Sequence, residues 1–331
     1  MSGGMESNSV ELPLVTVLVG CYNHARFVLQ TLESVRHQTY PRIQLIIWDD
    51  CSQDNSVEVI RSWIRQHSFE CVFLQHDRNR GLCRSLNEAL ALARGKYVAT
   101  VAADDLWMPE RIERQVRIME NAPADVGVVY SDAFQMDEDG NALPRMLIEP
   151  RHKAAGPPEG FIFDAIIEEN FIPAMTTLVR RECFAQVGAY DEDLAFEDWD
   201  MWIRISRTFR FVYDKVPATK YRILPGSLSR RAEAMLRSTL LAMEKYLSLG
   251  WLSAQQRKAA LYKPVWYLYR LGLPIPWRWK GLLLRHNRSA KAVGVVVCST
   301  LGISYARTQQ IRAFCVRLKG KLSGRKSEDW N

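Results

Sequence analysis

The chain has 331 residues, of which 47% are hydrophobic and 24% are charged, and its formal net charge is +7. This length and apolar content are enough to bury one large α/β core and leave roughly a hundred residues for an appendage. The seven cysteines are scattered and form no Cys-x-x-Cys pair. This pattern excludes a disulfide framework and a cysteine-based zinc site, and it is typical of reduced thiols in a cytoplasmic protein.

Residues 1–12 are polar and contain no apolar signal segment, so we expect a disordered N-terminus and no export. From there to Tyr130, short β-branched runs alternate with segments of helical period. This alternation predicts a mostly parallel sheet with helices on both faces. The stretch that follows, up to Gly160, is rich in Pro, Gly and charge and is typical of a mobile loop over a site. The predicted strands span residues 15–19, 43–48, 71–74, 96–101 and 126–130.

Acidic residues directly follow two of these strands. Asp49 and Asp50 come after the second strand, and Asp104 and Asp105 come after the fourth. Ligands of such sheets bind at the carboxyl ends of the strands, so both pairs are expected at one edge. Clustered carboxylates raise each other's pKa unless a cation offsets their charge. Mg²⁺ or Mn²⁺ together with a phosphate group is the simplest solution, because both ions prefer oxygen ligands.

Motifs of other nucleotide-binding classes are missing from the sequence. No Gly-x-Gly-x-x-Gly follows the first strand and no Gly-x-x-x-x-Gly-Lys occurs, which argues against dinucleotide oxidoreductases and P-loop NTPases. A sugar-nucleotide pyrophosphorylase would need a Gly-rich loop with Arg or Lys after the first strand, and this loop is absent. The six histidines show no i, i+4 pair with a third ligand, so we expect ordinary surface or core histidines and no zinc enzyme.

The C-terminal part of the chain is strongly basic. Residues 251–331 contain 16 Lys or Arg and two acidic residues, whereas residues 1–250 contain 28 basic and 35 acidic ones. Trp and Leu lie among these basic residues, which fits a membrane interface better than a nucleic-acid groove. The longest clean apolar stretch, residues 292–304, is too short to cross a bilayer of about 30 Å as a helix. We therefore expect 251–331 to lie on an anionic membrane at its inner, cytoplasmic face; a helical cap on the main domain is the alternative.

Five segments, in the right order, resemble family 2 glycosyltransferases of the GT-A fold. Each segment alone is a weak match, but together they are specific. The resemblance implies a catalytic domain over residues 13–230, with a nucleotide-binding half at 13–130 and an acceptor half at 131–230. Residues 231–331 would then form a helical basic extension. The matching segments are Val15 to Asn23, Trp48 to Ser56, Asn79 to Leu82, Asp104 to Pro109 and Glu197 to Trp202.

The resemblance implies a set of residues around the donor nucleotide. Asp49 and Asp50 would flank the nucleotide, one of them bonding the uracil or the ribose. Tyr22 would stack on the base and Asn23 would face it, although a helix N-cap explains Asn23 equally well. A further implied contact is the loop of Arg80-Gly81, which would let the backbone approach the donor; an ordinary turn also explains this glycine.

The resemblance also implies a metal site at Asp104 and Asp105. They match the end of the Asp-x-Asp signature, whose carboxylate holds the metal that bridges the donor diphosphate. The first Asp of that signature is replaced by Ala102. Arg222 belongs to a terminal Tyr-Arg-x-His-like region in which Leu224 replaces the histidine. This arginine would either neutralise the diphosphate or pair with a core carboxylate.

Asp198 matches the family's general base, which takes the proton of the acceptor hydroxyl, and Glu197 would orient the site. The alternative is that both only complement the dipole of the helix they open. The predicted function is inverting transfer of a sugar from a nucleotide diphosphate, UDP above all, to a hydroxyl of a glycan or lipid-linked saccharide. A catalytically degenerate binding or scaffold protein in polysaccharide assembly is the alternative, because Ala102 and Leu224 stand where the family often has a carboxylate and a histidine. For the same reason we expect metal and nucleotide to bind together, each weakly alone.

Overall fold

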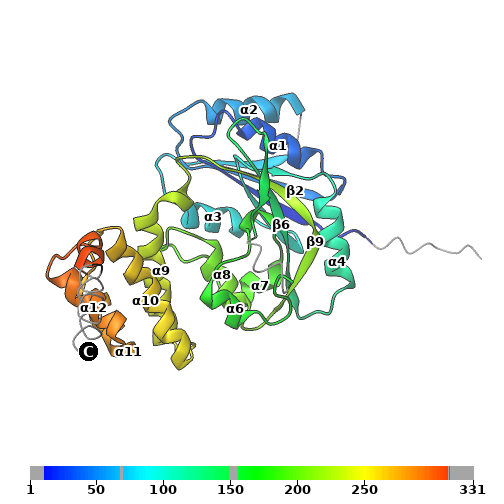
Figure 1. Ribbon diagram of the computed structural model, residues 1–331. Coiled ribbons are helices and arrows are strands. Elements are labelled where there is room, and N and C mark those ends of the chain that lie inside the picture. Colours follow the sequence, from blue (N-terminus) through cyan, green and yellow to red (C-terminus); the bar gives the residue numbers. More distant parts are fainter. Residues whose placement is uncertain (1–10, 68–69, 149–155, 312, 314–331) are drawn as a thin grey trace, which may run out of the picture. The chain divides into compact units, whose positions relative to one another are not determined.

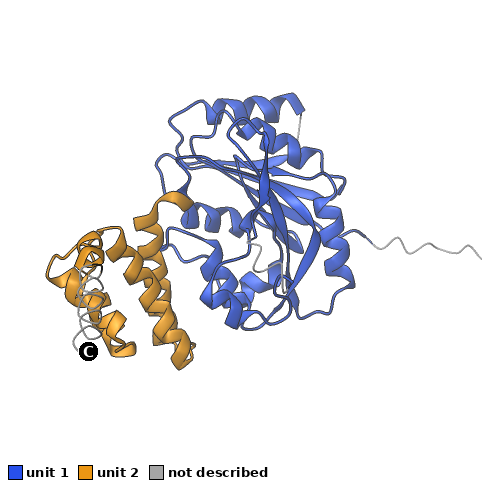
Figure 2. Cartoon of the chain, viewed as in Figure 1, with its two compact units in different colours: residues 1–228 blue, residues 229–331 orange. Residues whose placement is uncertain are grey.

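The structure is a computed structural model, and it describes residues 11–67, 70–148, 156–311 and 313. The chain divides into two compact units, Met1–Leu228 and Ser229–Asn331 (Figure 2). The predicted disordered segment, residues 1–12, lies outside the described residues except for its last two positions.

Within the described residues, a nine-stranded mixed sheet forms the centre of the first unit (Figure 1). Its order is β3-β2-β1-β4-β8-β6-β9-β5, and β7, outside this path, pairs with the C-terminal part of β6. The strands are β1 (Val15–Cys21), β2 (Ile43–Asp49), β3 (Cys71–Gln75), β4 (Tyr97–Ala102), β5 (Leu106–Trp107), β6 (Val126–Met136), β7 (Ala142–Met146), β8 (Leu178–Arg180) and β9 (Arg210–Arg222).

The first four strands are the part of the sheet that the sequence pattern predicts. They pair in parallel as β3-β2-β1-β4, and the β-branched residues of β1 are fully buried. A strand buried on both faces needs this continuous apolar composition. The later strands add antiparallel pairs, β4 with β8 and β8 with β6, while β6 and β9 run parallel. The predicted α/β fold is confirmed, with a sheet that is mixed in its second half.

Helices cover both faces of this sheet (Figure 1). The buried faces of α1, α2 and α4 share one hydrophobic core with Val15 and Val17 of β1. On the other face, α3 packs against β1 and β2. The helices are α1 (Val28–Arg36), α2 (Ser56–His67), α3 (Leu82–Ala91), α4 (Arg111–Asn121), α6 (Phe163–Glu168), α7 (Arg181–Val187) and α8 (Asp198–Ile205), with short 3₁₀ turns at Ala174–Thr176 and Leu228–Arg230.

The loop predicted between Asp132 and Gly160 is partly a hairpin. Strand β6 continues to Met136 and pairs in antiparallel fashion with β7. A turn closes the hairpin, with the Asp137 N–H donating to the Asn141 carbonyl over 3.0 Å. The loop prediction was therefore wrong for this part, because β7 is a five-residue strand that is largely exposed and contains Pro144, a residue typical of loops and edge strands. Residues 149–155 of the predicted loop lie outside the described residues.

The second unit is helical in its described part and has its own apolar core. Its core side chains include Leu240, Leu261, Val265, Leu283 and Val296. Within the residues that the structure describes, no helix combines the length and the apolar character that a membrane span requires. The helices are α9 (Ala232–Ser248), α10 (Ala254–Arg270), α11 (Trp277–His286) and α12 (Ala290–Thr300).

Candidate active site

The ends of β1, β2 and β4 bring the predicted donor residues to one edge of the sheet. In the parallel register, Cys21 lies opposite Asp49, and Gly20 lies opposite Ala102. The segments that follow these three strands therefore start side by side. They carry Tyr22 and Asn23, Asp50, and the acidic pair Asp104-Asp105.

The loop after β1 is fastened to the loop after β2. The Asn23 N–H donates to Ser52 Oγ over 2.8 Å, and the His24 N–H donates to Ser56 Oγ over 3.0 Å. Asn23 has a positive φ of 57°, and its side-chain oxygen accepts from a backbone N–H of the β2 loop. It does not cap α1, whose N-cap position is Phe27, so the capping alternative is wrong. The side chain of Tyr22 is 41% exposed and therefore accessible to a ligand.

Asp49 and Asp50 differ in their surroundings. Asp49 is fully buried, and its two oxygens accept from the N–H and the hydroxyl of Ser52 at 2.8 and 2.6 Å. In this structure Asp49 thus holds the turn after β2. Its predicted contact with the nucleotide stays a prediction.

Asp50 lies at the centre of a buried hydrogen-bond network. Its Oδ1 accepts from the Arg80 N–H at 2.8 Å, from His76 Nδ1 at 3.0 Å and from the Ser85 hydroxyl at 3.1 Å. Its Oδ2 accepts from the Gly81 N–H at 2.9 Å and from no other donor in the described part of the chain. Burial opposes ionisation, but these hydrogen bonds outweigh it and lower the pKa of Asp50. Asp50 is therefore an anion, and its Oδ2 has the capacity for one more donor.

The Arg80-Gly81 loop contacts Asp50 through its backbone. The Arg80 guanidinium itself is paired with Glu88, with Nη1 and Oε1 2.7 Å apart. Gly81 has φ 85° and ψ 158°, a conformation that essentially only glycine adopts. The N–H groups of this loop bond Asp50, and the arginine charge is neutralised within the protein. The predicted approach of this backbone to the donor stays a prediction.

Asp104 and Asp105 have different roles. Among the described residues, the Asp104 carboxylate accepts no hydrogen bond, and His24 Nδ1 is 3.9 Å from its Oδ1. Asp105 is only 2% exposed, and its Oδ1 accepts the Arg222 N–H at 2.9 Å. Burial, followed by the charge of Asp104, raises the pKa of Asp105 well above its ordinary value. Asp104 is thus the member of the pair whose oxygens are open to a ligand.

Arg222 supports this acidic pair from within the protein. Its side chain is buried, and its Nε donates to the Asp104 carbonyl at 2.9 Å. Nη1 donates to the Glu138 carbonyl at 2.8 Å and Nη2 to Gln30 Oε1 at 2.9 Å. Each guanidinium nitrogen therefore has a protein partner. The guanidinium thus bonds carbonyl and amide oxygens, and only the Arg222 backbone N–H bonds a carboxylate, that of Asp105. The two predicted roles, contact with a diphosphate and pairing with a core carboxylate, stay predictions.

The protein offers few metal ligands of its own. In the described part of the chain, no three His, Cys, Asp or Glu side chains are grouped so that they could hold a metal ion. Ala102 and Leu224, which replace two polar residues of the family pattern, contribute no ligand side chain. A cation at Asp104 would need phosphate oxygens or water to complete its coordination.

The predicted general base opens α8. Asp198 is half-buried; its Oδ1 accepts the Trp199 N–H at 2.6 Å and its Oδ2 accepts from Asn170 Nδ2 at 2.9 Å. Burial raises the pKa of Asp198, and the Asn170 hydrogen bond lowers it in part. Burial and the adjacent Asp198 charge also raise the pKa of Glu197. A helix N-terminus lowers the pKa of a carboxylate, so burial outweighs the effect of the helix dipole at both residues. The predicted role of Asp198 as general base stays a prediction.

The first turn of α3 connects the donor side to the Asp198 side. Gly81 precedes this turn and bonds Asp50, and Cys83 lies within it. Cys83 Sγ is 3.5 Å from the Leu194 carbonyl oxygen and 3.6 Å from that of Phe196, directly before Glu197. The structure thus joins the two halves of the predicted site through one helix terminus.

Three polar residues in these networks were not among the predicted site residues. His76 is buried, with Nδ1 on Asp50 and Nε2 3.2 Å from Glu88. His24 lies beside Asp104, and Asn170 bonds Asp198. His24 could have been selected, because it follows β1 at the edge where ligands bind. No pattern in the sequence connects Asn170 with Asp198, which lies 28 positions further on.

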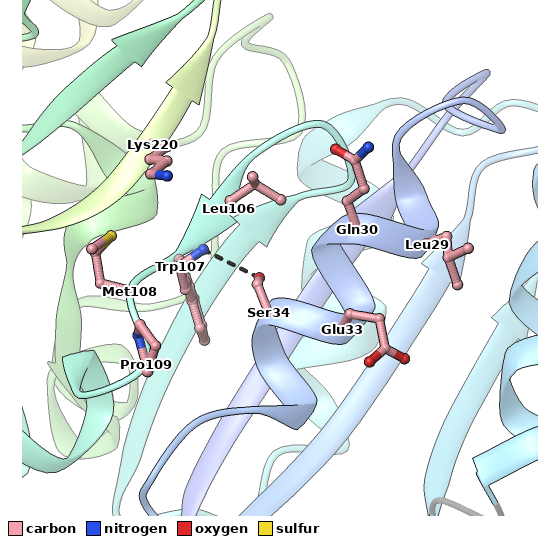
Figure 3. Close-up of a pocket in the computed structure, with 9 residues that line it drawn as sticks. All are labelled: Leu29, Gln30, Glu33, Ser34, Leu106, Trp107, Met108, Pro109 and Lys220. Carbon is pink, nitrogen blue, oxygen red and sulfur yellow. Dashed lines mark hydrogen bonds between the residues drawn. The ribbon is translucent and has the colours of Figure 1, made fainter. Parts of the chain in front are cut away.

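A separate pocket of about 500 Å³ lies between α1 and the segment around β5 (Figure 3). In it the Trp107 N–H donates to Ser34 Oγ over 3.2 Å, shown as a dashed line. None of its lining residues is a predicted site residue, and we do not assign the donor to it. The lining consists of Leu29, Gln30, Glu33, Ser34, Leu106, Trp107, Met108, Pro109 and Lys220.

Parallel strands that end in two acidic pairs, followed by a mixed second half of the sheet, define the GT-A class of nucleotide-sugar transferases. The family model "Glycosyl transferase family 2" matches residues 16–188, over half of the chain, and the protein belongs to this family. The glycosyltransferase MJ1057 of Methanocaldococcus jannaschii is 31% identical over 221 residues, which cover 65% of this chain and 72% of that protein. TuaG of Bacillus subtilis, named for teichuronic acid biosynthesis, is 26% identical over 263 residues, which cover 76% of this chain and 97% of that protein.

Solved structures share the fold at low sequence identity. TarS of S. aureus in complex with UDP-GlcNAc matches with a TM-score of 0.60 and 16% identity, over 86% of this chain and 81% of that one. The mannosyltransferase PcManGT of Pyrobaculum calidifontis, in complex with GDP-Man and Mn²⁺, matches with a TM-score of 0.58 and 17% identity. The match covers 93% of this chain and 81% of that one. The predicted family, GT-A fold and enzyme class, a glycosyltransferase, are confirmed.

Proposed function

We propose that the protein is an inverting glycosyltransferase that moves a sugar from a nucleotide diphosphate, UDP above all, to a hydroxyl of a glycan or lipid-linked saccharide. The observation that carries this proposal is the Asp104 carboxylate after β4, which accepts no hydrogen bond from the described residues, together with the exposed Tyr22 after the neighbouring β1. The UDP-GlcNAc complex of TarS supports a UDP donor. The GDP-Man complex of PcManGT makes GDP the competing base, and the name of TuaG supports a polysaccharide acceptor.

The donor nucleotide would lie between the loops after β1 and β2. Tyr22 supplies an aromatic face for the base, and Asp50 Oδ2 has the capacity to accept a base or ribose hydrogen. The position of Asp50 is held by four hydrogen bonds, so a donor would meet an oriented carboxylate. Such preorganisation favours binding, because little side-chain freedom is lost.

The residues at the acidic pair fit a divalent cation. The Asp104 carboxylate accepts no hydrogen bond from the described residues, and burial, followed by the charge of Asp104, raises the pKa of the neighbouring Asp105. A bound Mn²⁺ or Mg²⁺ would neutralise charge that develops on the departing diphosphate. Asp104 would hold the ion, and Asp105, anchored by Arg222, would add to the negative potential.

Asp198 would act on the acceptor. Its carboxylate takes the proton of the acceptor hydroxyl while that oxygen forms a bond to the anomeric carbon. The bond from this carbon to the nucleotide diphosphate breaks on the opposite face, so the configuration inverts. Asn170 holds one carboxylate oxygen, which orients the base. Burial and the Asp198 charge raise the pKa of Glu197 to about 8, so Glu197 would orient the site mainly as a neutral carboxyl group at neutral pH.

A panel of nucleotide sugars tests this proposal. We expect enzyme-dependent release of UDP from one UDP-sugar, its loss with EDTA and its recovery with Mn²⁺. The anomeric configuration of the transferred sugar, measured by NMR, should be opposite to that of the donor. Absence of turnover with every donor, together with no binding of UDP or GDP by calorimetry, would contradict the proposal.

We further propose that the basic extension docks on an anionic membrane, which would bring the enzyme to a lipid-linked acceptor. The described part of this unit exposes large apolar side chains that its own core does not cover. On α12, Val293 and Val297 are exposed at i, i+4 spacing, and Leu301 continues this row. Trp277 on α11 is 70% exposed. Exposed apolar side chains in a unit of high positive charge fit a lipid interface with anionic headgroups.

A further inference from the structure

His24 is held firmly in the loop after β1. Its N–H donates to Ser56 Oγ at 3.0 Å, and the preceding Asn23 N–H donates to Ser52 Oγ at 2.8 Å. Its ring contacts Phe27 edge to face, with the ring centroids 6.2 Å apart. The imidazole therefore has a defined position at the sheet edge, and three quarters of the side chain is covered.

Two open ligand atoms face each other at this position. His24 Nδ1 is buried and has no hydrogen-bond partner among the described residues, and the Asp104 carboxylate accepts no hydrogen bond there either. A buried polar atom without a partner destabilises the folded state by about 1 to 3 kcal/mol unless something else satisfies it. Nδ1 and Asp104 Oδ1 are 3.9 Å apart, too far for a hydrogen bond.

The separation suits a shared metal ion. Two ligands that each lie about 2.1 Å from one octahedral ion are about 3.0 Å apart when adjacent and about 4.2 Å apart when opposite. The observed 3.9 Å is closer to the second value, and the two atoms would have to move apart by only about 0.3 Å to take opposite positions on such an ion. A bridging water would hold its two partners about 4.5 to 5.5 Å apart at ordinary hydrogen-bond lengths and angles. The gap therefore matches an ion better than a water molecule.

We propose that His24 Nδ1 is a ligand of the divalent cation held by Asp104. This inference rests on the metal dependence proposed above and adds an imidazole from a different part of the chain than Leu224, where the family pattern has a histidine. The two protein ligands leave the remaining positions to phosphate oxygens and water, in keeping with the lack of a third grouped ligand in the described residues. Because imidazole suits transition ions better than Mg²⁺, the site should prefer Mn²⁺.

Electron spin echo envelope modulation of Mn²⁺ bound in the presence of UDP tests the inference on the full chain. We expect nitrogen modulation from a coordinated imidazole, and we expect it to change when the protein is labelled with ¹⁵N-histidine. The label separates protein nitrogen from the uracil nitrogens. His24→Gln should abolish the modulation and weaken Mn²⁺ binding about 10- to 100-fold. His37→Gln, which alters a histidine with a 59% exposed side chain, is the matched control and should change neither.

The outcomes separate this inference from the proposed function. Mn²⁺ that binds with UDP and is lost in Asp104→Ala, but shows no imidazole modulation in the unsubstituted protein, would overturn the role of His24 alone. No Mn²⁺ binding with any nucleotide would overturn the proposed metal dependence and the inference with it. The measurement on the unsubstituted protein decides the question even if His24→Gln does not fold.

Discussion

At the scale of single residues, the protonation of Asp198 should control the rate. Asp198 must be ionised to accept a proton, and burial raises its pKa above the ordinary 3.8. We therefore predict that kcat/KM for the acceptor falls as the pH drops through this raised pKa. Asn170→Ala removes a hydrogen bond that lowers this pKa, so the acid limb should move to higher pH, by up to about one unit. A pH–rate profile checks this, and a shift to lower pH would contradict it.

Substitution of Asp198 tests whether it acts in chemistry or in folding. Asp198→Asn keeps the shape and the oxygen that accepts from Asn170 but cannot take a proton. We predict that transfer falls by about 10²- to 10⁴-fold, the usual contribution of a general base, while UDP binding changes less than twofold. Steady-state rates and calorimetry on the same preparation separate the two effects. If donor binding falls together with the rate, Asp198 has a structural role.

Asp105 should reduce the stability of the metal-free protein. It is 2% exposed beside a second carboxylate, and this environment disfavours its charge. Asp105→Asn keeps an oxygen for the Arg222 N–H and removes the charge. We predict that its free energy of unfolding in urea with EDTA rises by on the order of 1 kcal/mol. Asp125→Asn, where the side chain is 48% exposed, is the control and should stay within about 0.5 kcal/mol. A lower stability of Asp105→Asn would refute this.

The sequence locates the acidic residues of the site. It does not show which of their oxygen atoms bond within the protein and which stay available to a ligand. The strand-end rule selects Asp50 and Asp104 because it needs only the position of each residue along the chain. Which oxygen stays open depends on partners far away in sequence. Arg222 is satisfied by Gln30 and Glu138, 192 and 84 positions away, and no local pattern encodes such pairs. The hydrogen-bond partners of Arg222 could therefore come only from the structure.

At the scale of elements, buried strands were predictable and exposed or very short ones were not. The strands β1, β2 and β4 consist of apolar runs that burial requires, and the partly exposed β3 has a shorter apolar run; the predicted bounds of all four agree with the structure within two residues. In contrast, β5 and β8 have two and three residues, too few to show a period, and β7 is short, largely exposed and contains Pro144. These elements depend on pairing with distant strands. For the same reason, the antiparallel pairs in the second half of the sheet were not foreseen.

The junction between the Asp50 loop and α3 should depend on glycine. Gly81 has φ 85° and ψ 158°, and its N–H donates to Asp50. Gly81→Ala meets no atom within 4 Å, so the effect should come from backbone strain alone. We predict a loss of about 1 to 3 kcal/mol in the free energy of unfolding and weaker UDP binding. Gly226→Ala, which also meets no atom and has no positive φ, should change neither; equal effects in both variants would argue against the strain.

At the scale of the whole molecule, the two units differ in charge and in what they expose. The acidic residues concentrate in the first 250 residues, and the last 81 residues contain 16 basic and two acidic ones. The second unit buries Trp279 and part of α12 in its own core, so only some of its aromatic and aliphatic residues are available to a membrane. Trp277 is exposed, and Lys280 Nζ lies 4.7 Å from its ring centroid. The sequence alone could not separate the two tryptophans, because both lie among basic residues.

The exposed face of α12 should therefore determine membrane binding. We predict that the protein co-floats with vesicles rich in phosphatidylglycerol and dissociates at about 1 M salt, where the screening length falls to about 3 Å. Val297→Glu with Leu301→Glu should weaken binding at least tenfold, because each buried apolar side chain contributes about 1.5 to 3 kcal/mol. Val72→Glu with Leu92→Glu is the control, since it adds the same charge at exposed apolar positions of the first unit. Equal loss in both variants would mean that net charge alone binds the membrane, and binding that persists at high salt would refute the electrostatic part of the anchor.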